Sequence, residues 1–149
     1  MRPKSIVNFE IAALLAVLVS IVNSWLSWDR VMAVQQAKLV AQGQGKMIGM
    51  MSNLGIGVAV IIVLIWLLLI WLVGRKGSPA AKWIYAVLAV IFLIFGLVGL
   101  ARGPVFGTVQ YGLAIVWDLL TLASLWFLFR PDAKAWFAEG RTADPADLR

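Results

Sequence analysis

One stretch of the chain constrains its fold more than any other. Residues from Met47 to Gly74 form a run of 28 consecutive uncharged residues, and the later part of this run reads VIIVLIWLLLIWLV. A helix needs about 20 mostly apolar residues to cross the roughly 30 Å hydrocarbon core of a bilayer. The run therefore predicts a membrane span over about 47–73.

Three further segments have the same apolar character, over about 6–25, 83–101 and 111–129. In lipid each backbone amide needs a partner within its own segment, so segments without a closed-barrel pattern must be helices. Only 13% of the residues are charged, about half the share in an average soluble domain. The sequence predicts an all-α fold, a polytopic four-helix transmembrane bundle, with residues 1–140 as a single membrane domain.

The distribution of Lys and Arg predicts how this bundle is oriented. Eight basic residues flank the spans on the side of the termini: Arg2, Lys4, Arg75, Lys76, Lys82, Arg130, Lys134 and Arg141. Four flank the opposite ends: Arg30, Lys38, Lys46 and Arg102. Because cytoplasmic loops carry the excess of positive charge, both termini are expected in the cytoplasm, with the first span uncleaved.

Two segments outside the spans are expected to have their own structure. Residues 30–46 show weak helical spacing, and two interpretations stay open: a helix on the outer surface, or a re-entrant element. Pro131 suits the first turn of a helix, so a juxtamembrane helix is expected over about 131–139. The polar residues 141–149 are expected to be a disordered tail.

The polar residues within the spans are few, and Asp118 is the most conspicuous of them. It lies in the apolar stretch AIVWDLLTL, on one helix face with Thr121. Asn23 and Asn53 are expected at a similar depth on neighbouring helices. These four residues form the candidate intramembrane polar or ion site. Asp118 is either a hydrogen-bonded clamp between helices or a site for a proton, a cation or a basic group.

Glu10 is the secondary candidate, near the cytoplasmic end of the first span. Its side chain is expected to reach water or to pair with Arg130 or Lys4. Small residues recur in three spans and predict close helix contacts inside the molecule. They are Ala12, Ala16, Ser20 and Ser24 in the first span, Gly55 and Ala59 in the second, and Ala89, Gly96, Gly99 and Gly103 in the third.

The composition excludes several kinds of functional site. The chain has no Cys and no His, which excludes disulfides, thiol chemistry, Cys/His zinc sites and His-ligated haem. No nucleophile–base pair, metal cluster or phosphate loop is recognisable, so no enzyme activity, catalytic residue, metal or cofactor is expected. The net charge is +6, but the basic residues lie between apolar runs, so no nucleic acid is expected as a partner.

Three short pieces carry a resemblance. The opening RPKSIVNFE, the stretch LSWD and the tail LFRPDAKAWF together resemble small four-helix inner-membrane proteins of bacteria to which no activity is attached. The resemblance implies a bacterial inner-membrane location and transfers no functional residue. The marks of three other small four-span types are missing: a mid-span glutamate in the first helix, the fluoride-channel signature and paired cysteines.

Two functions follow as expectations. The first is a structural or accessory protein of the inner membrane that binds lipid, another membrane protein or a second copy of itself. The alternative is a homo-oligomeric ion channel or proton-coupled transporter that uses Asp118, because intramembrane acids are functional candidates by default.

Overall fold

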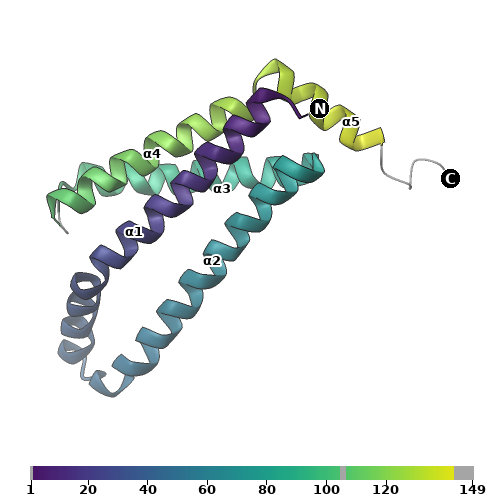
Figure 1. Cartoon of the computed structure of the whole chain (residues 1–149). Helices are drawn as coiled ribbons and strands as arrows, with labels where there is room; N and C mark the ends of the chain where they lie inside the picture. The colour runs from purple at the N-terminus through teal and green to yellow at the C-terminus, as the bar shows by residue number, and fades with distance from the viewer. Residues whose placement is uncertain (1, 105–106, 143–149) are drawn as a thin grey trace.

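The computed structural model of the chain describes residues 2–104 and 107–142, and the described residues are helical with short turns. The elements in order are α1 (Lys4–Ala41), the 3₁₀ turn η1 (Gly45–Met47), α2 (Ile48–Lys76), α3 (Pro79–Ala101), α4 (Thr108–Leu128) and α5 (Pro131–Thr142). Helices α1 to α4 are each long and apolar enough to cross a membrane. The predicted fold class, an all-α protein with four such helices, is confirmed (Figure 1).

Helix α1 is longer than a single span requires. Its 38 residues correspond to about 57 Å at 1.5 Å per residue. Neither Gly nor Pro occurs between Lys4 and Gln42, so nothing in the sequence ends the helix earlier. Residues 30–41 therefore continue α1 without a break, and Figure 1 shows these last turns at an angle to the first part. Gly43, with φ 71°, then forms the turn toward η1.

The turn between α2 and α3 is formed by residues with specific backbone roles. Gly77 has φ 59°, a conformation that L side chains rarely adopt. The Ser78 side chain accepts a hydrogen bond from the Ala81 amide at 3.3 Å, and Pro79 occupies the first turn of α3. This combination of an N-cap serine and a following proline fixes the start of α3, four residues before the predicted span boundary at residue 83.

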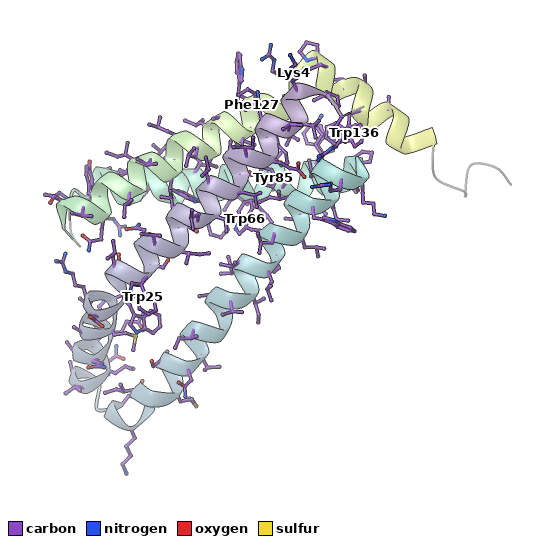
Figure 2. All side chains as sticks on the ribbon, viewed as in Figure 1. Lys4, Trp25, Trp66, Tyr85, Phe127 and Trp136 are labelled. Carbon is purple, nitrogen blue, oxygen red and sulfur yellow. The ribbon has the colours of Figure 1, made fainter. Side chains whose placement is uncertain are left out.

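The four long helices are neighbours in the cyclic order α1, α2, α3, α4, and α1 has its most extensive contact with α4. Their apolar core lies at the end of the bundle that holds the N-terminus, the α2–α3 turn and α5, here called the terminal end (Figure 1). Phe9 and Trp66 both pack edge-on against the ring of Tyr85, with centroids 4.9 and 5.2 Å away. Figure 2 shows Trp66 and Tyr85 where the helices converge.

The opposite end, here called the distal end, holds the α1–η1–α2 and α3–α4 turns and is more open. The buried residues of α2 are confined to its last part, from Leu69 to Gly74. Residues 53–62 of α2 are all exposed. Figure 1 shows α2 leaning away from the other helices over this stretch. Only α1, α3 and α4 therefore stay packed together toward the distal end.

Helix α5 closes the terminal end. Ala133 and Phe137 are buried in the core, and the Trp136 indole donates a hydrogen bond to the Val73 carbonyl at 3.3 Å. The Lys82 ammonium lies 4.7 Å from the ring centroids of both Phe129 and Phe137. Sequence reasoning ended this helix at 139, whereas the structure continues it to Thr142. The remaining tail, 143–149, lies outside the described residues.

Candidate ligand-binding pocket

A pocket of about 460 Å³ lies between α1, α3 and α4 at the distal end. This volume is within the range of about 300–1,000 Å³ that is usual for small-molecule sites. Its walls combine short polar side chains, glycines and a few larger groups. They are Ser20, Asn23, Ser24 and Ser27 from α1; Gly96, Gly99, Leu100, Arg102, Gly103 and Pro104 from α3 and its turn; and Gly107, Gln110, Tyr111, Ala114 and Trp117 from α4.

The small-residue stripe of α1 explains why the pocket exists. Ala12 and Ala16 are buried, so the terminal part of the stripe is a close helix contact. Ser20 and Ser24, farther along the same stripe, line the pocket instead. Glycines on α3 contribute in the same way, because a Cβ atom at Gly99 would meet nothing within 4 Å beyond the backbone of its own helix. Small side chains thus leave a space where the helices diverge.

Asp118 lies behind the pocket wall, on α4. Its residue is only 4% exposed, and its carboxylate packs directly against Gly96, a residue of the wall. A Cβ atom at position 96 would collide with Asp118 Oδ1. Neither carboxylate oxygen has a hydrogen-bond partner among the described residues. Because buried polar atoms are normally satisfied, this arrangement does not supply the interhelical hydrogen bond that the clamp interpretation of Asp118 requires.

Asn23 lines the same pocket from α1. Its side-chain oxygen Oδ1 is buried and, like the Asp118 oxygens, has no hydrogen-bond partner among the described residues. Its backbone carbonyl accepts a bond of 2.7 Å from the Ser27 hydroxyl. Asn23 therefore lines the pocket, and Asp118 lies directly behind the part of its wall formed by Gly96.

Thr121 is buried one turn from Asp118, on the same face of α4. Its hydroxyl donates to the Trp117 carbonyl at 2.8 Å, the local bond that threonine commonly makes within a helix. The proton of Thr121 is thus committed to its own helix, and Thr121 contributes no hydrogen bond to the Asp118 carboxylate.

Asn53 is not brought to this pocket. It is exposed on α2 and lines a separate shallow groove with Met50, Leu54, Gly57, Val58 and Ile61, all from α2 itself. The depth inferred from sequence did not reveal that α2 separates from the other helices. Of the four predicted site residues, Asn23 lines the pocket, Asp118 and Thr121 are buried on α4 outside its lining, and Asn53 lies on a different surface.

Sequence reasoning missed a buried polar pair below Thr121. The Tyr85 hydroxyl lies 2.7 Å from the Ser124 hydroxyl, and Ser124 donates to the Thr121 carbonyl at 2.8 Å. Since Ser124 has one proton, Tyr85 is the donor in the first bond. Ser124 follows Thr121 by three residues, so helical spacing could have indicated it. No pattern in α3 distinguishes Tyr85 from the surrounding apolar residues.

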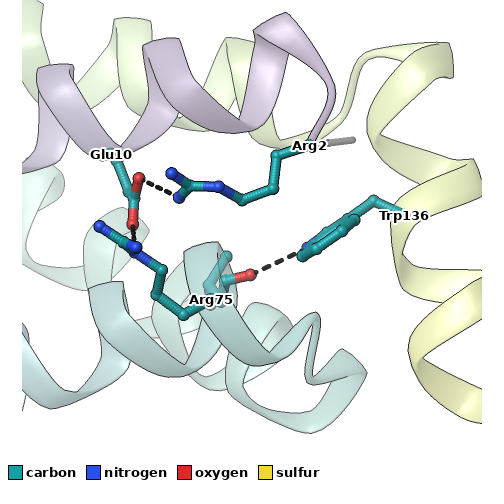
Figure 3. Close-up of polar contacts among 5 residues, drawn as sticks. Arg2, Glu10, Arg75 and Trp136 are labelled. Atoms are coloured by element: carbon teal, nitrogen blue, oxygen red, sulfur yellow. Dashed lines mark hydrogen bonds and ion pairs between the residues drawn. The ribbon is translucent and has the colours of Figure 1, made fainter. Parts of the chain in front are cut away.

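Glu10 lies at the terminal end, away from the pocket. Its carboxylate pairs with Arg2 Nη1 at 2.7 Å and with Arg75 Nε at 3.3 Å (Figure 3). The partners expected from sequence, Arg130 and Lys4, are therefore replaced by Arg2 and Arg75. The reason is Gly74: a Cβ there would lie 2.6 Å from Glu10 Oε1, so the glycine lets the carboxylate lie against α2. Glu10 joins α1 to α2.

Two arginines lie at the mouth of the pocket. Arg102 lines it from the end of α3, and the Arg30 guanidinium packs against Gly107, another lining residue. Two other lining side chains form hydrogen bonds to backbone carbonyls. Tyr111 donates to the Leu100 carbonyl at 3.2 Å, and the Gln110 amide donates to the Leu26 carbonyl at 3.2 Å. The mouth is therefore basic, whereas Asn23 lines the pocket between the helices and the Asp118 carboxylate lies behind its wall at Gly96.

Among the described residues, no group of three or more His, Cys, Asp or Glu side chains could hold a metal ion. The lining of the pocket is mostly apolar with a few polar side chains, which suits an amphiphilic ligand. The fold and the pocket define a multi-pass, all-helical membrane protein with a site between three of its helices. Comparison with protein-family models, with curated proteins and with solved structures finds no match to this chain.

Proposed function

We propose that this chain is an accessory protein of the bacterial inner membrane that binds a lipid in the pocket between α1, α3 and α4. The observation that carries the proposal is a pocket of about 460 Å³ that is lined by Asn23 and backed, behind Gly96, by Asp118, both with buried, unpartnered oxygens. Unsatisfied acceptors are costly in an apolar medium. A ligand with hydrogen-bond donors would satisfy them and so be bound selectively.

The course of α2 supports a lipid rather than a water-soluble ligand. Because residues 53–62 of α2 are exposed, the helix does not cover the interior of the bundle at the distal end. Exposed apolar side chains, including Val22 and Leu26 of α1 and Phe95 of α3, lie on the helices that form the pocket. Acyl chains could leave the pocket along such surfaces without entering water.

Three hydroxyl groups of the pocket favour binding over catalysis. Ser20 donates to the Val17 carbonyl, Ser27 to the Asn23 carbonyl, and Tyr111 to the Leu100 carbonyl. A catalytic nucleophile needs a base within hydrogen-bond reach, whereas these groups bond to backbone oxygens. We therefore propose no enzyme activity.

The eight-to-four asymmetry of Lys and Arg supports a cytoplasmic terminal end, which would place the pocket in the outer half of the membrane. Reporter fusions after Arg149 and within residues 35–42 test this orientation. The C-terminal reporter should be active only in the cytoplasm and the other only outside; the reverse pattern would refute the orientation.

A pocket-filling variant tests the proposed function itself. Gly99 lines the pocket and has open space around its Cβ position, so Gly99→Leu should block the pocket while the helix stays intact. The matched control is Gly112→Leu, since Gly112 also has open space but lies outside the pocket wall. Native mass spectrometry of the purified proteins should show bound phospholipid in the wild type and the control, and little in Gly99→Leu. Equal lipid retention by all three would reject the proposal.

Transport through Asp118 is the second candidate. The observation in its favour is the row of buried polar residues Asp118, Thr121 and Ser124 along one face of α4, which reaches Tyr85. Against it, the Thr121 and Ser124 protons are committed to backbone carbonyls. Proteoliposomes with a pH-sensitive dye would decide: a proton flux that Asp118→Asn abolishes would favour transport over binding.

A further inference from the structure

Two arginines from different helices lie at the distal mouth of the pocket. Arg102 lines the pocket just past the end of α3. Arg30 belongs to α1, and its guanidinium lies against Gly107 of the lining, where a Cβ atom would collide with Arg30 Nη1. Both side chains keep their charge at any physiological pH. The fold therefore places two permanent positive charges at one opening.

Neither charge is neutralised by a carboxylate among the described residues. The ion pairs found there both involve Glu10, at the terminal end. Asp29 precedes Arg30, but consecutive side chains point about 100° apart around a helix, and Asp29 forms no ion pair within the described residues. Two like charges at one opening repel each other. An anion bound beside both would offset this repulsion.

The first turn of α4 adds partial positive charge to the same opening. This helix begins at Thr108, directly after Gly107, and no side chain caps it among the described residues. The first N–H groups of a helix have no intrahelical acceptor and carry the positive end of its dipole. The arginines and this helix start thus surround the mouth with hydrogen-bond donors from three elements.

The inner end of the pocket has a different character. Its lining extends along α1 from Ser27 back to Ser20, which is about 10 Å at 1.5 Å per residue. Gly96, Ala114 and Trp117 line the pocket from α3 and α4 and bring no positive charge. A matching ligand therefore has an anionic group at one end and an apolar chain at the other.

We infer that the pocket binds a phospholipid with a net negative headgroup, such as phosphatidylglycerol. This inference rests on the proposed function and names the class of its ligand. The phosphate lies at the mouth, because guanidinium groups bind phosphate oxygens through charge-assisted hydrogen bonds. The start of an acyl chain lies beside Gly96. A zwitterionic headgroup also has a phosphate, but its ammonium group is repelled by the same two arginines.

The test compares phosphatidylglycerol with phosphatidylcholine, with identical short acyl chains, on the purified full-length protein. Titrations followed by native mass spectrometry should show about tenfold tighter binding of phosphatidylglycerol at low salt, and this preference should shrink as salt is added before desalting for measurement. Arg102→Gln and Arg30→Gln should each lower the preference to about twofold, because each removes a charge-assisted bond.

Lys38→Gln is the matched control. It removes the same charge from the same helix, at an exposed position outside the pocket lining, and should keep the tenfold preference. Arg102→Lys provides a second variant, which retains the charge but loses the guanidinium fork, and should retain more of the preference than Arg102→Gln. Both arginines are exposed, so these variants should fold, and circular dichroism verifies this.

The outcomes separate this inference from the proposed function. Equal affinity for the two lipids, both lost in Gly99→Leu, would overturn the headgroup assignment and leave lipid binding in the pocket intact. A loss of preference in Lys38→Gln as large as in the arginine variants would also overturn the assignment, because the overall charge would then explain it. Binding that Gly99→Leu does not change would overturn both. Soluble glycerol phosphate that binds as tightly as phosphatidylglycerol would overturn the lipid as the source of the phosphate.

Discussion

The terminal and distal ends of this molecule both contain parts of the four long helices but differ in how tightly these helices pack. At the terminal end, large apolar side chains from five helices interlock around Phe9, Tyr85 and Val73. At the distal end, α2 departs and small residues leave a pocket between α1, α3 and α4. One end provides stability, which allows the other to hold a pocket with unsatisfied groups. Packing in this protein is therefore concentrated at one end.

The largest expected effect comes from removing a core ring at the terminal end. Phe9 is 0% exposed and packs on Tyr85, so Phe9→Ala should lower the free energy of unfolding by about 3 kcal/mol, at the lower end of values for buried Phe. The matched control is Phe95→Ala, because Phe95 is 69% exposed and should change it little. Unfolding in mixed micelles measures both, and equal losses would contradict the concentration of packing at the terminal end.

The next effect tests the close contact between Gly96 of the pocket wall and Asp118. Gly96→Ala places a methyl group against Asp118 and should destabilise the fold by about 1–3 kcal/mol, as overpacking does. Gly99→Ala, one turn away with open space, should be neutral or slightly stabilising, since Ala favours helices. Replacing Asp118 with Ala in the Gly96→Ala background should restore stability; persistent destabilisation there would show that the carboxylate is not what the methyl group meets.

A smaller effect is expected from the ion pairs at the terminal end. Glu10→Gln should cost up to about 1 kcal/mol, because the Arg2 and Arg75 partners are partly exposed and screened by solvent. A double-mutant cycle of Glu10 with Arg2 should show a coupling energy that declines with added salt. The cycle of Glu10 with Lys4 serves as the control and should show none. Coupling to Lys4 instead would support the partner expected from sequence.

The smallest effect concerns α5 and depends on pH. The hydrogen bond from Ser5 lowers the pKa of Asp132, which lies in the first turn of α5. A lowered pKa in the folded state means that the ionised carboxylate stabilises docking above its ordinary pKa of 3.8, and that this stabilisation is lost as the pH falls below that value. The chain has no Cys, so a fluorophore on a single cysteine at Ala135 can report docking.

Docking of α5 should therefore be constant at neutral pH and weaken only in acid. Asp132→Asn should weaken it slightly at neutral pH and remove the acid-dependent step. An unchanged acid transition in Asp132→Asn would assign that transition to another group.

The sequence predicted the spans because each apolar run has a length that only a membrane helix explains. It also predicted a common site for Asp118 and Asn23; in the structure Asn23 lines the pocket and Asp118 lies behind its wall at Gly96. It could not predict that Asn53 lies elsewhere, or that Gly55 and Ala59 are exposed rather than packed within the molecule. The depth of a residue in the membrane follows from its position along its own helix. The divergence of α2, in contrast, depends on contacts between side chains that are distant in the sequence.

The same limit applies to the polar contacts. Glu10 was expected to reach water or to pair with Arg130 or Lys4, whereas it pairs with Arg2 and Arg75, and its position against α2 depends on the space that Gly74 provides. The Tyr85–Ser124 pair joins residues 39 positions apart, and nothing local to either residue indicates the other. Close approaches that need a glycine on a facing helix are the features that sequence periodicity does not reveal.

The docking of α5 has a consequence for how the protein is made. The Ser5 amide bonds to the Asp132 carboxylate across 127 residues of chain, and Ile6 and Phe9 share one core with Phe137. Contacts of such long sequence separation form late, because the intervening chain must first be synthesised and ordered. The first hairpin to enter the membrane must therefore wait for the last helix before its core is complete. A chain that stops before Pro131 would insert in the membrane without α5. Its core at the terminal end would then be exposed, and quality-control proteases could recognise it there.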